Sequence, residues 1–304
     1  MPIHLKHSPG DLRRAFRRRI GEGVLLRAPG VFDPMSAKLV ESAGFEVLYV
    51  SGGGISRSMG FPDVGLVTMT EVIERVRLIT GGVSIPSIVD VDTGYGNAIN
   101  LIRTVQCFED AGASAIHIED QVTPKKCGHY TGKSLISTEE MVLKIKAALN
   151  ARRDPNLIVI ARTDARAVEG LDAAIERAHA YIDVGADMLF FEAPESIEEM
   201  RAVSAAIDAP LLINMFGGGK TPSVPLNDLE SIGFRIVIFP SHLQRASIKA
   251  MQGALEILKR DDLADGEDTQ LMVTFNERDA IVNLDGMKDL EKRYLHVPQA
   301  EEEA

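Results

Sequence analysis

A cysteine lies among basic side chains in the segment Lys125-Lys126-Cys127-Gly128-His129. Neighbouring cations favour the thiolate form, so this thiol has the surroundings of one that reacts or transfers protons. Gly128 lets the backbone turn sharply or approach a ligand closely. The alternative is a solvated basic loop with an incidental cysteine, and the place of this loop in the fold decides between the two.

Carboxylate, amide and imidazole groups follow several short apolar runs along the chain. The groups that would meet if these runs were the strands of a barrel are Asp90, Asp92, His117, Glu119, Asp120, Asp164, Glu192 and Asn214. Clustered carboxylates raise each other's pKa values, and a hard divalent cation relieves the repulsion. Oxygen ligands with retained water suit Mg²⁺ or Mn²⁺. Residues two apart on a strand share a face, so we expect Asp90 and Asp92 to reach one ion, although such residues also cap helices.

Two further features could bind an anionic substrate. The turn Ser51-Gly52-Gly53-Gly54 offers bare backbone N–H groups to a carboxylate or phosphate, or is a generic flexible loop. Arg162 could bind a substrate carboxylate through two parallel hydrogen bonds, or form a structural ion pair with Asp164.

The elements that must position these groups alternate between β-rich and helical runs. The expected strands are Val24–Ala28, Glu46–Ser51, Ser84–Asp90, Ala115–Asp120, Leu157–Thr163, Met188–Glu192, Leu211–Met215 and Arg235–Phe239. The expected helices include Thr70–Thr80, Asn97–Ala111, Thr138–Arg152 and Gly170–Val184. Roughly eight such βα units predict an α/β fold, a TIM (β/α)8 barrel. A doubly wound open sheet is the alternative, but the first helix lacks a Gly-x-Gly-x-x-Gly opening.

The predicted domains are a catalytic barrel over residues 1–260 and a C-terminal helical extension over residues 261–304. We expect the acidic end, Glu301-Glu302-Glu303-Ala304, to be disordered. A closed barrel leaves no room for the extension's apolar positions, so we expect them to pack on a partner subunit.

Composition excludes several classes of function. The 304 residues are 45% hydrophobic, enough for one large core, and carry a formal charge of −11, which argues against nucleic-acid binding. Neither a membrane-spanning run nor a signal-peptide core is evident, and the two cysteines suit a reducing cytoplasm. Cys107, within a helical pattern beside Phe108, is interpreted as a small packing residue.

Several motifs resemble those of the isocitrate lyase/phosphoenolpyruvate mutase superfamily, over Leu26 to Lys259. They are Tyr49-Val50-Ser51-Gly52-Gly53-Gly54, Gly60-Phe61-Pro62-Asp63-Val64-Gly65, Asp90-Val91-Asp92-Thr93-Gly94-Tyr95-Gly96, His117-Ile118-Glu119-Asp120-Gln121, the cysteine loop and Ala161-Arg162-Thr163-Asp164-Ala165. The sequence is most similar to the 2-methylisocitrate lyase and 2,3-dimethylmalate lyase branches. The resemblance implies a metal-dependent enzyme that swaps its last helix with a neighbour and assembles as a homotetramer, a dimer of dimers.

The resemblance also implies roles for individual residues. Asp90 would coordinate Mg²⁺ directly, with Asp63, Asp92 and Glu119 acting through water. The other implied positions are Ser51, Gly52, Gly53 and Arg162 on a pyruvate-like fragment, Cys127 as general acid, Lys125, Gly128 and His129 beside it in the loop, Tyr49 near the reacting oxygens, and Glu192, Asn214 and His117 in the active site.

The chemistry implied is carbon–carbon cleavage of a 2-hydroxy di- or tricarboxylate, a small-molecule substrate, to pyruvate and a second, succinate-like carboxylic acid. Arg245 matches an arginine that binds an additional carboxylate in methylisocitrate lyases, or is a solvated helix cation. Against a tricarboxylate, Phe216 and Gly217 replace a hydroxyl and a carboxylate of the usual pattern, and Tyr95 stands where phenylalanine is common. A 2,3-dimethylmalate-type lyase, a carboxyphosphonoenolpyruvate- or phosphonopyruvate-type mutase and a non-catalytic scaffold are the alternatives.

Overall fold

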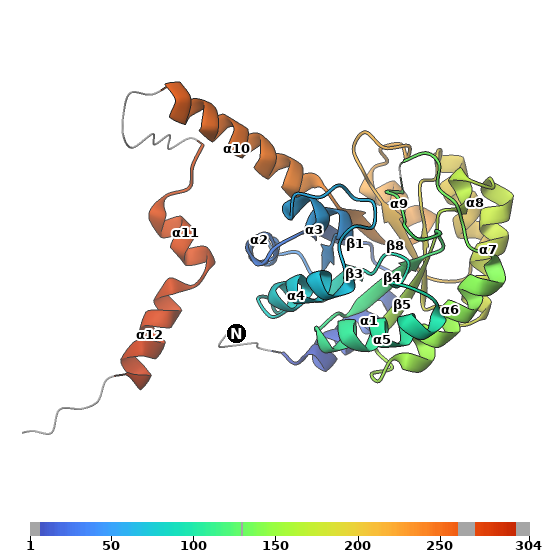
Figure 1. Ribbon diagram of the computed structural model, residues 1–304, viewed down its shortest axis with the longest axis horizontal. Coiled ribbons are helices and arrows are strands. Elements are labelled where there is room, and N and C mark those ends of the chain that lie inside the picture. The colour runs from blue at the N-terminus through green and yellow to red at the C-terminus, as the bar shows by residue number, and fades with distance from the viewer. Residues whose placement is uncertain (1–6, 129, 261–270, 296–304) are drawn as a thin grey trace, which may run out of the picture. The chain divides into compact units, whose positions relative to one another are not determined.

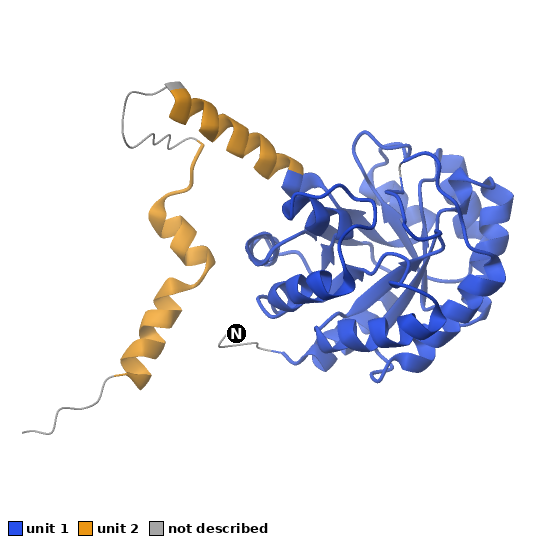
Figure 2. Cartoon of the chain, viewed as in Figure 1, with its two compact units in different colours: residues 1–244 blue, residues 245–304 orange. Residues whose placement is uncertain are grey.

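The computed structural model describes residues 7–128, 130–260 and 271–295. The chain divides into two compact units, residues 1–244 and residues 245–304 (Figure 2).

The first unit is built on a closed barrel of parallel strands that neighbour one another in chain order (Figure 1). The strands are β1 (Leu26–Val31), β2 (Leu48–Val50), β3 (Ser87–Asp90), β4 (Ala115–Glu119), β5 (Ile158–Thr163), β6 (Met188–Phe191), β7 (Leu211–Asn214) and β8 (Phe234–Phe239). β8 pairs with β1, with Ile236 opposite Leu26, and this pairing closes the ring. The predicted TIM barrel is confirmed, and each predicted strand is present with its ends shifted by a few residues.

Helices surround the strands (Figure 1). They are α1 (Pro9–Gly21), α2 (Pro34–Ser42), α3 (Gly52–Ser58), α4 (Met69–Thr80), α5 (Ala98–Asp110), α6 (Thr138–Ala151), the 3₁₀ turn η1 (Ala165–Ala167), α7 (Leu171–Asp183), α8 (Ile197–Ala206) and α9 (Leu226–Ile232). Side-chain caps explain where several of them begin. The hydroxyls of Thr68 and Ser137 accept from the backbone N–H groups of Glu71 and Glu140, and so satisfy donors that have no acceptor inside the helix.

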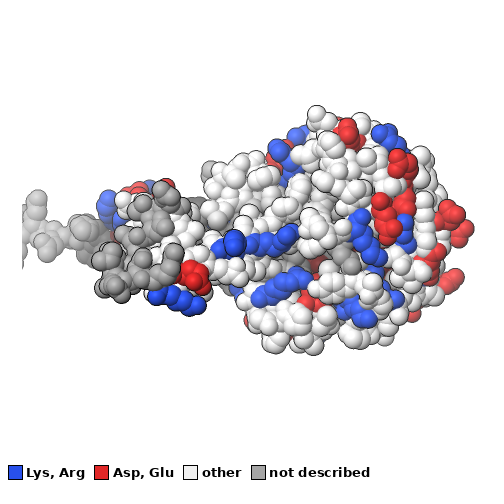
Figure 3. Space-filling model, turned by 90° about the horizontal axis from the view of Figure 1, so that it is seen from above, with Lys and Arg blue, Asp and Glu red and all other residues white. Residues whose placement is uncertain are grey.

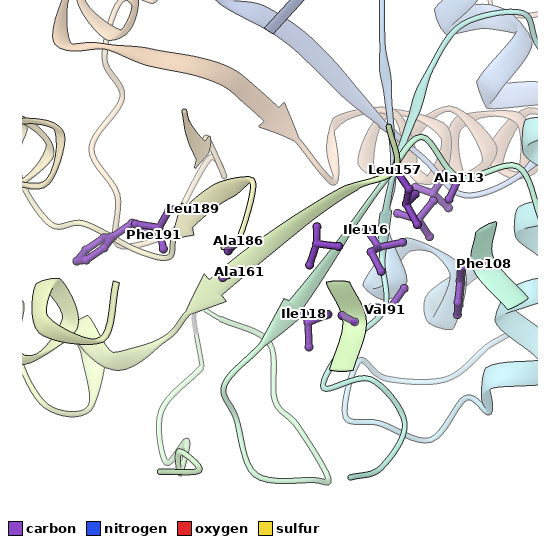
Figure 4. Close-up of a cluster of buried hydrophobic side chains, with 14 of the residues drawn as sticks. Val91, Phe108, Ala113, Ile116, Ile118, Leu157, Ala161, Ala186, Leu189 and Phe191 are labelled. Carbon is purple, nitrogen blue, oxygen red and sulfur yellow. The ribbon is translucent and has the colours of Figure 1, made fainter. Parts of the chain in front are cut away.

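The core has two parts. Outside the barrel, side chains such as Ile116, Leu189 and Phe191 face the surrounding helices (Figure 4). Inside it, Phe16 and Ile20 of α1 pack with strand residues that include Leu26 and Met188, the first residues of β1 and β6. Helix α1 therefore covers the amino-terminal end of the barrel, and the carboxyl ends are left for the site. Cys107 packs partly buried against the outer core, as predicted.

The second unit holds most of α10 (His242–Arg260), together with α11 (Phe275–Ile281) and α12 (Leu284–Tyr294). Neither α11 nor α12 has a buried side chain. The predicted disordered end, residues 301–304, lies outside the described residues.

The surface in Figure 3 carries Lys and Arg side chains among Asp and Glu side chains, and not a continuous basic stripe. In the described part of the chain, no helix combines the length and apolar character that crossing a membrane requires.

Candidate active site

A small cavity of about 60 Å³ lies at the carboxyl ends of the strands. It is lined by Tyr49, Ser51, Gly53, Arg57, Asp63, Asp90, Lys125, Cys127, Gly128, Arg162, Phe190, Glu192, Asn214, Phe216, Pro240 and Ser241. Most of the residues predicted from the sequence are thus brought to one place. Ligand sites of TIM-barrel enzymes lie at this end of the fold.

The remaining predicted residues have different positions. Gly52, His117, Glu119 and Asp92 lie next to lining residues without being part of the wall. Arg245 belongs to the second unit, and His129 lies outside the described residues.

The glycine-rich segment after β2 is the first turn of α3, and the interpretation of it as a flexible loop is wrong. Ser51 is the N-cap, and its hydroxyl accepts from the backbone N–H of Gly54 at 3.0 Å. A Cβ added at Gly52 would lie 2.9 Å from Asp90 Oδ2, and one added at Gly53 would lie 2.6 Å from Asp63 Oδ2. Glycine at these positions lets the helix backbone approach the carboxylates.

Lys125 joins two of the predicted metal-site carboxylates. Its Nζ lies 2.5 Å from Asp63 Oδ1 and 2.8 Å from Asp92 Oδ1, and its side chain is 6% exposed. Burial opposes the charge, but Asp92, Asp90, Glu119 and Asp63 outweigh it and raise the pKa of Lys125 well above its usual value. Lys125 is therefore cationic at neutral pH and partly neutralises this cluster.

Asp92 reaches the cluster from a turn. β3 ends at Asp90, and Asp92 has a left-handed φ of 48° with its N–H donating to Asp90 Oδ1 at 3.0 Å. The argument that two strand residues share a face therefore does not apply. A tight turn, stabilised by a local hydrogen bond, brings the two side chains together instead.

The carboxyl groups of Asp90 and Asp92 have different pKa values. Burial opposes ionisation of Asp90, but the positive charges of His117, Lys125 and Arg162 outweigh it and lower the pKa to about 2. Burial raises the pKa of Asp92 to about 6, against the opposing charge of Lys125. Burial also lowers the pKa of His117 to about 4, so its ring is neutral at pH 7 and the cations acting on Asp90 there are Lys125 and Arg162.

Tyr49 lies between Asp90 and His117. Its hydroxyl is 3.4 Å from Asp90 Oδ2 and 2.9 Å from His117 Nε2. Burial, with the charge of Asp90, raises the pKa of Tyr49 well above its usual value, so the hydroxyl keeps its proton. Tyr49 is thus a hydrogen-bond donor at the edge of the cavity.

Arg162 forms a buried ion-pair network. Its Nε lies 2.9 Å from Asp164 Oδ2 and its Nη1 lies 3.1 Å from Glu119 Oε2, while Glu192 Oε2 is 3.9 Å from Nε. Its guanidinium also lies over the ring of Phe190, 5.1 Å from the centroid. The ion pair with Asp164 considered from the sequence is present, and Arg162 lines the cavity as well.

The cysteine loop lies over this network. A Cβ added at Gly128 would be 2.6 Å from Arg162 Nη2 and 2.6 Å from Glu192 Oε1. Only glycine fits this approach, and it places the backbone next to Cys127 against the residues at the ends of β5 and β6. Cys127 is partly buried and lines the cavity.

The carboxylates fit a hydrated divalent cation. No three His, Cys, Asp or Glu side chains in the described residues form a ready-made metal cage. Mg²⁺, however, keeps several waters and is held by one or two carboxylates plus the substrate, so a cage is not required. The buried Oε1 of Glu119 accepts no hydrogen bond from the described residues, and leaves an oxygen for a water or an ion.

Sequence reasoning missed several residues of the site. Arg57, Phe190, Pro240 and Ser241 line the cavity, and Lys133, which is part of the loop itself, donates to the Gly128 carbonyl and to Asp164. Phe190 could have been found, because it lies two residues before Glu192, the last residue of the predicted strand, and therefore shares its face. Lys133 carries no such signal, since its partner Asp164 is 31 residues away.

The sequence model of the phosphoenolpyruvate phosphomutase family matches residues 16–259. The chain belongs to this family. The resemblance to the isocitrate lyase/phosphoenolpyruvate mutase superfamily is thereby confirmed.

Two curated relatives are similar to the chain at about the same level, and a solved structure matches it at lower identity. The 2-methylisocitrate lyase of Aeropyrum pernix is 46% identical over 94% of this chain and 91% of its own length. The 2,3-dimethylmalate lyase of Eubacterium barkeri is 45% identical over 88% of this chain and 92% of its own. The crystal structure of phosphonopyruvate hydrolase in complex with oxalate and Mg²⁺ has a TM-score of 0.85 and 32% identity, over 93% of this chain and 99% of that one.

Proposed function

We propose that this chain is a metal-dependent carbon–carbon lyase that cleaves a 2-hydroxy di- or tricarboxylate of the 2-methylisocitrate kind to pyruvate and a second carboxylic acid. The observation that carries the proposal is the convergence of Cys127, Arg162, Asp63 and Asp90 on one cavity, with Asp92 held beside it by Lys125. Lyases with 45% and 46% identity over most of the chain support it.

The metal is Mg²⁺ or Mn²⁺, with Asp90 as the direct ligand and Asp63, Asp92 and Glu119 acting through water. When bound, such an ion lowers the pKa of the substrate hydroxyl and stabilises its oxyanion. Asp90 is suited to this role, because its low pKa keeps it anionic at neutral pH.

The substrate would bind through its pyruvate-like part. Arg162 and the backbone of Ser51, Gly52 and Gly53 would hold the carboxylate and the C2 oxygen, with the Tyr49 hydroxyl as a further donor. The C2 hydroxyl gives its proton to a general base, and the C2–C3 bond breaks as that oxygen becomes a carbonyl. The electron pair of that bond passes to the second fragment as an enediolate.

Cys127 would complete the reaction by giving its thiol proton to C3 of that enediolate. Its loop covers the cavity, and this excludes water that would compete for the carbanion. Lys125, Glu192 and Asn214 would fix the charges and orientation of the groups around it.

The test is pyruvate release from 2-methylisocitrate, 2,3-dimethylmalate and phosphonopyruvate, with Mg²⁺ and with a chelator. We expect pyruvate from a 2-hydroxy acid only when the metal is present. Conversion of the phosphonopyruvate phosphorus-31 signal to that of phosphoenolpyruvate, with no pyruvate formed, would assign the mutase reaction instead. Metal binding without turnover would assign the scaffold.

A smaller diacid of the 2,3-dimethylmalate type is the second candidate, supported by the segment after β7. Phe216 lines the cavity and also a neighbouring pocket of about 370 Å³ that contains Met215, Val224, Leu226 and Phe239. Thr221, Ser223 and His242 line that pocket as well, but the ring of Phe216 at the cavity itself is apolar and suits an alkyl substituent better than a third carboxylate. In that case 2,3-dimethylmalate would show the higher kcat/KM.

The quaternary structure proposed is a homotetramer of helix-swapped dimers. The support is the exposure of α11 and α12, where Phe275 is 72% exposed. A partner subunit that covered this surface would bury its apolar side chains.

A further inference from the structure

The loop that carries Cys127 joins β4 to α6. Gln121 hydrogen-bonds to the part of this loop that comes directly before Cys127. The side-chain amide of Gln121 accepts from the backbone N–H of Lys126 at 2.9 Å and donates to its carbonyl at 2.8 Å. These bonds fix the residue directly before Cys127. The Gln121 hydrogen bonds do not explain how Gly128, the residue after Cys127, is held against Arg162.

Lys133 supplies that contact. Its side chain is 2% exposed, and its Nζ donates to the Gly128 carbonyl and to Asp164 Oδ1, the latter at 2.7 Å. A buried ammonium group is costly unless it is paired and hydrogen-bonded, so this position is specified by both acceptors.

Asp164 gives Lys133 a rigid anchor. The backbone N–H of Asp164 donates to Asp120 Oδ1 at 2.9 Å, and Asp120 in turn accepts from the hydroxyls of Thr163 and Tyr181. The carboxylate of Asp164 also accepts twice from Arg162. Lys133 and Arg162 therefore share one fixed carboxylate. The hydrogen bond from Lys133 to the Gly128 carbonyl connects that carboxylate to the backbone next to Cys127.

The neighbouring Lys126 offers a comparison within the same loop. Its Nζ donates to the Gly132 carbonyl at 2.6 Å, but the residue is exposed and this bond joins two parts of the loop to each other. The bond from Lys133 instead joins the loop to the end of β5.

We infer that Lys133 is a positioning residue, which holds the Cys127–Gly128 backbone over the cavity through Asp164. This rests on the proposed function, in which Cys127 delivers the proton. Lys133 acts through Gly128, so its loss should slow proton delivery while substrate binding at Arg162 is largely kept.

The experiment compares Lys133→Met, Lys133→Arg and Lys126→Met with the parent chain. The first readout needs no substrate: the rate at which iodoacetamide alkylates Cys127, followed by peptide mass spectrometry with Cys107 as internal reference. A hydrogen bond from a charged donor holds the loop, so we expect Lys133→Met to be alkylated about tenfold faster or more. Lys126→Met should not be alkylated faster than the parent, because its surface bond contributes little and loss of a cation beside the thiol disfavours the thiolate.

The second readout is the kinetics of pyruvate release. Lys133→Met should lower kcat by about tenfold or more with KM changed far less, since a group placed for the chemical step is displaced. Lys133→Arg, which keeps the charge and the reach, should recover most of kcat. If Lys133→Met does not fold, Lys133→Gln takes its place, because it removes the charge and keeps one donor.

Equal alkylation rates in folded Lys133→Met and Lys126→Met would overturn the inference, as would an unchanged kcat with a raised KM. Failure of the proposed function is distinguishable, because no pyruvate would then form in the parent chain while the alkylation comparison still reports on the loop.

Discussion

Gly128 lies so close to Arg162 that a Cβ on Gly128 would be 2.6 Å from the guanidinium nitrogen Nη2. This contact joins the loop of the proposed acid to the residue proposed to bind the substrate carboxylate. We expect Gly128→Ala to displace the loop and to lower kcat ~10²-fold, the scale of a displacement of about 1 Å at a catalytic group.

The control for Gly128→Ala is Gly21→Ala in α1, where an added Cβ meets no described atom within 4 Å. It should keep parental kcat and stability. Steady-state kinetics with circular dichroism measures both variants, and parental activity in Gly128→Ala would contradict the tight approach.

Asp90→Ala should abolish metal-dependent turnover and leave the barrel folded. The reason is that Asp90 is the carboxylate kept most strongly ionised, with a pKa of about 2. Titration calorimetry with Mn²⁺ should show weaker binding in the variant than in the parent. Full activity of Asp90→Ala in the presence of a chelator would refute the metal assignment.

Asp164→Asn should lower the free energy of unfolding by about 3 kcal/mol at pH 7, because it leaves two buried cations without their shared anion. Burial opposes ionisation of Asp164, but Arg162 and Lys133 outweigh it and hold its folded-state pKa below the usual value. A lowered pKa gives stability that is complete above the unfolded value and is lost as the pH falls through the folded one.

The difference between parent and Asp164→Asn should therefore be constant above about pH 5 and shrink below about pH 4. Urea unfolding across this range measures it. A difference that grows as the pH falls would contradict the ion-pair explanation.

Removal of residues 261–304 should lower the oligomeric state, because neither α11 nor α12 has a buried side chain and a partner subunit would cover their apolar positions. Light scattering after size-exclusion chromatography gives the mass, and a chain that ends at Leu295 is the control that keeps both helices. A truncated chain with the full oligomer mass would count against a partner-bound extension.

The sequence predicted the barrel well because most of the strands are short, largely apolar runs that are buried on both faces. The residues at which the strands end were less well predicted. β3 ends at Asp90, and Asp92 is placed by a left-handed turn that the alternating pattern does not reveal. The helix α3 was missed because three successive glycines indicate a turn, whereas the Ser51 cap stabilises a helix there.

The residues that line the cavity were anticipated where they follow strand ends, and less well where the contacts cross the fold. The place of Lys125 between Asp63 and Asp92, and that of Lys133 on Asp164, follow from how the β4–α6 loop folds back on the barrel. Spacing along the chain carries no information on such contacts.

The most direct test of the account is pyruvate release by Cys127→Ser beside the parent enzyme, with Mg²⁺ and the best 2-hydroxy acid substrate. A serine hydroxyl is a far weaker acid than a thiol. We therefore expect the parent to form pyruvate and the variant to turn over at least ~10²-fold more slowly, with substrate binding kept. Turnover of Cys127→Ser close to that of the parent would contradict the proton-donor role of Cys127.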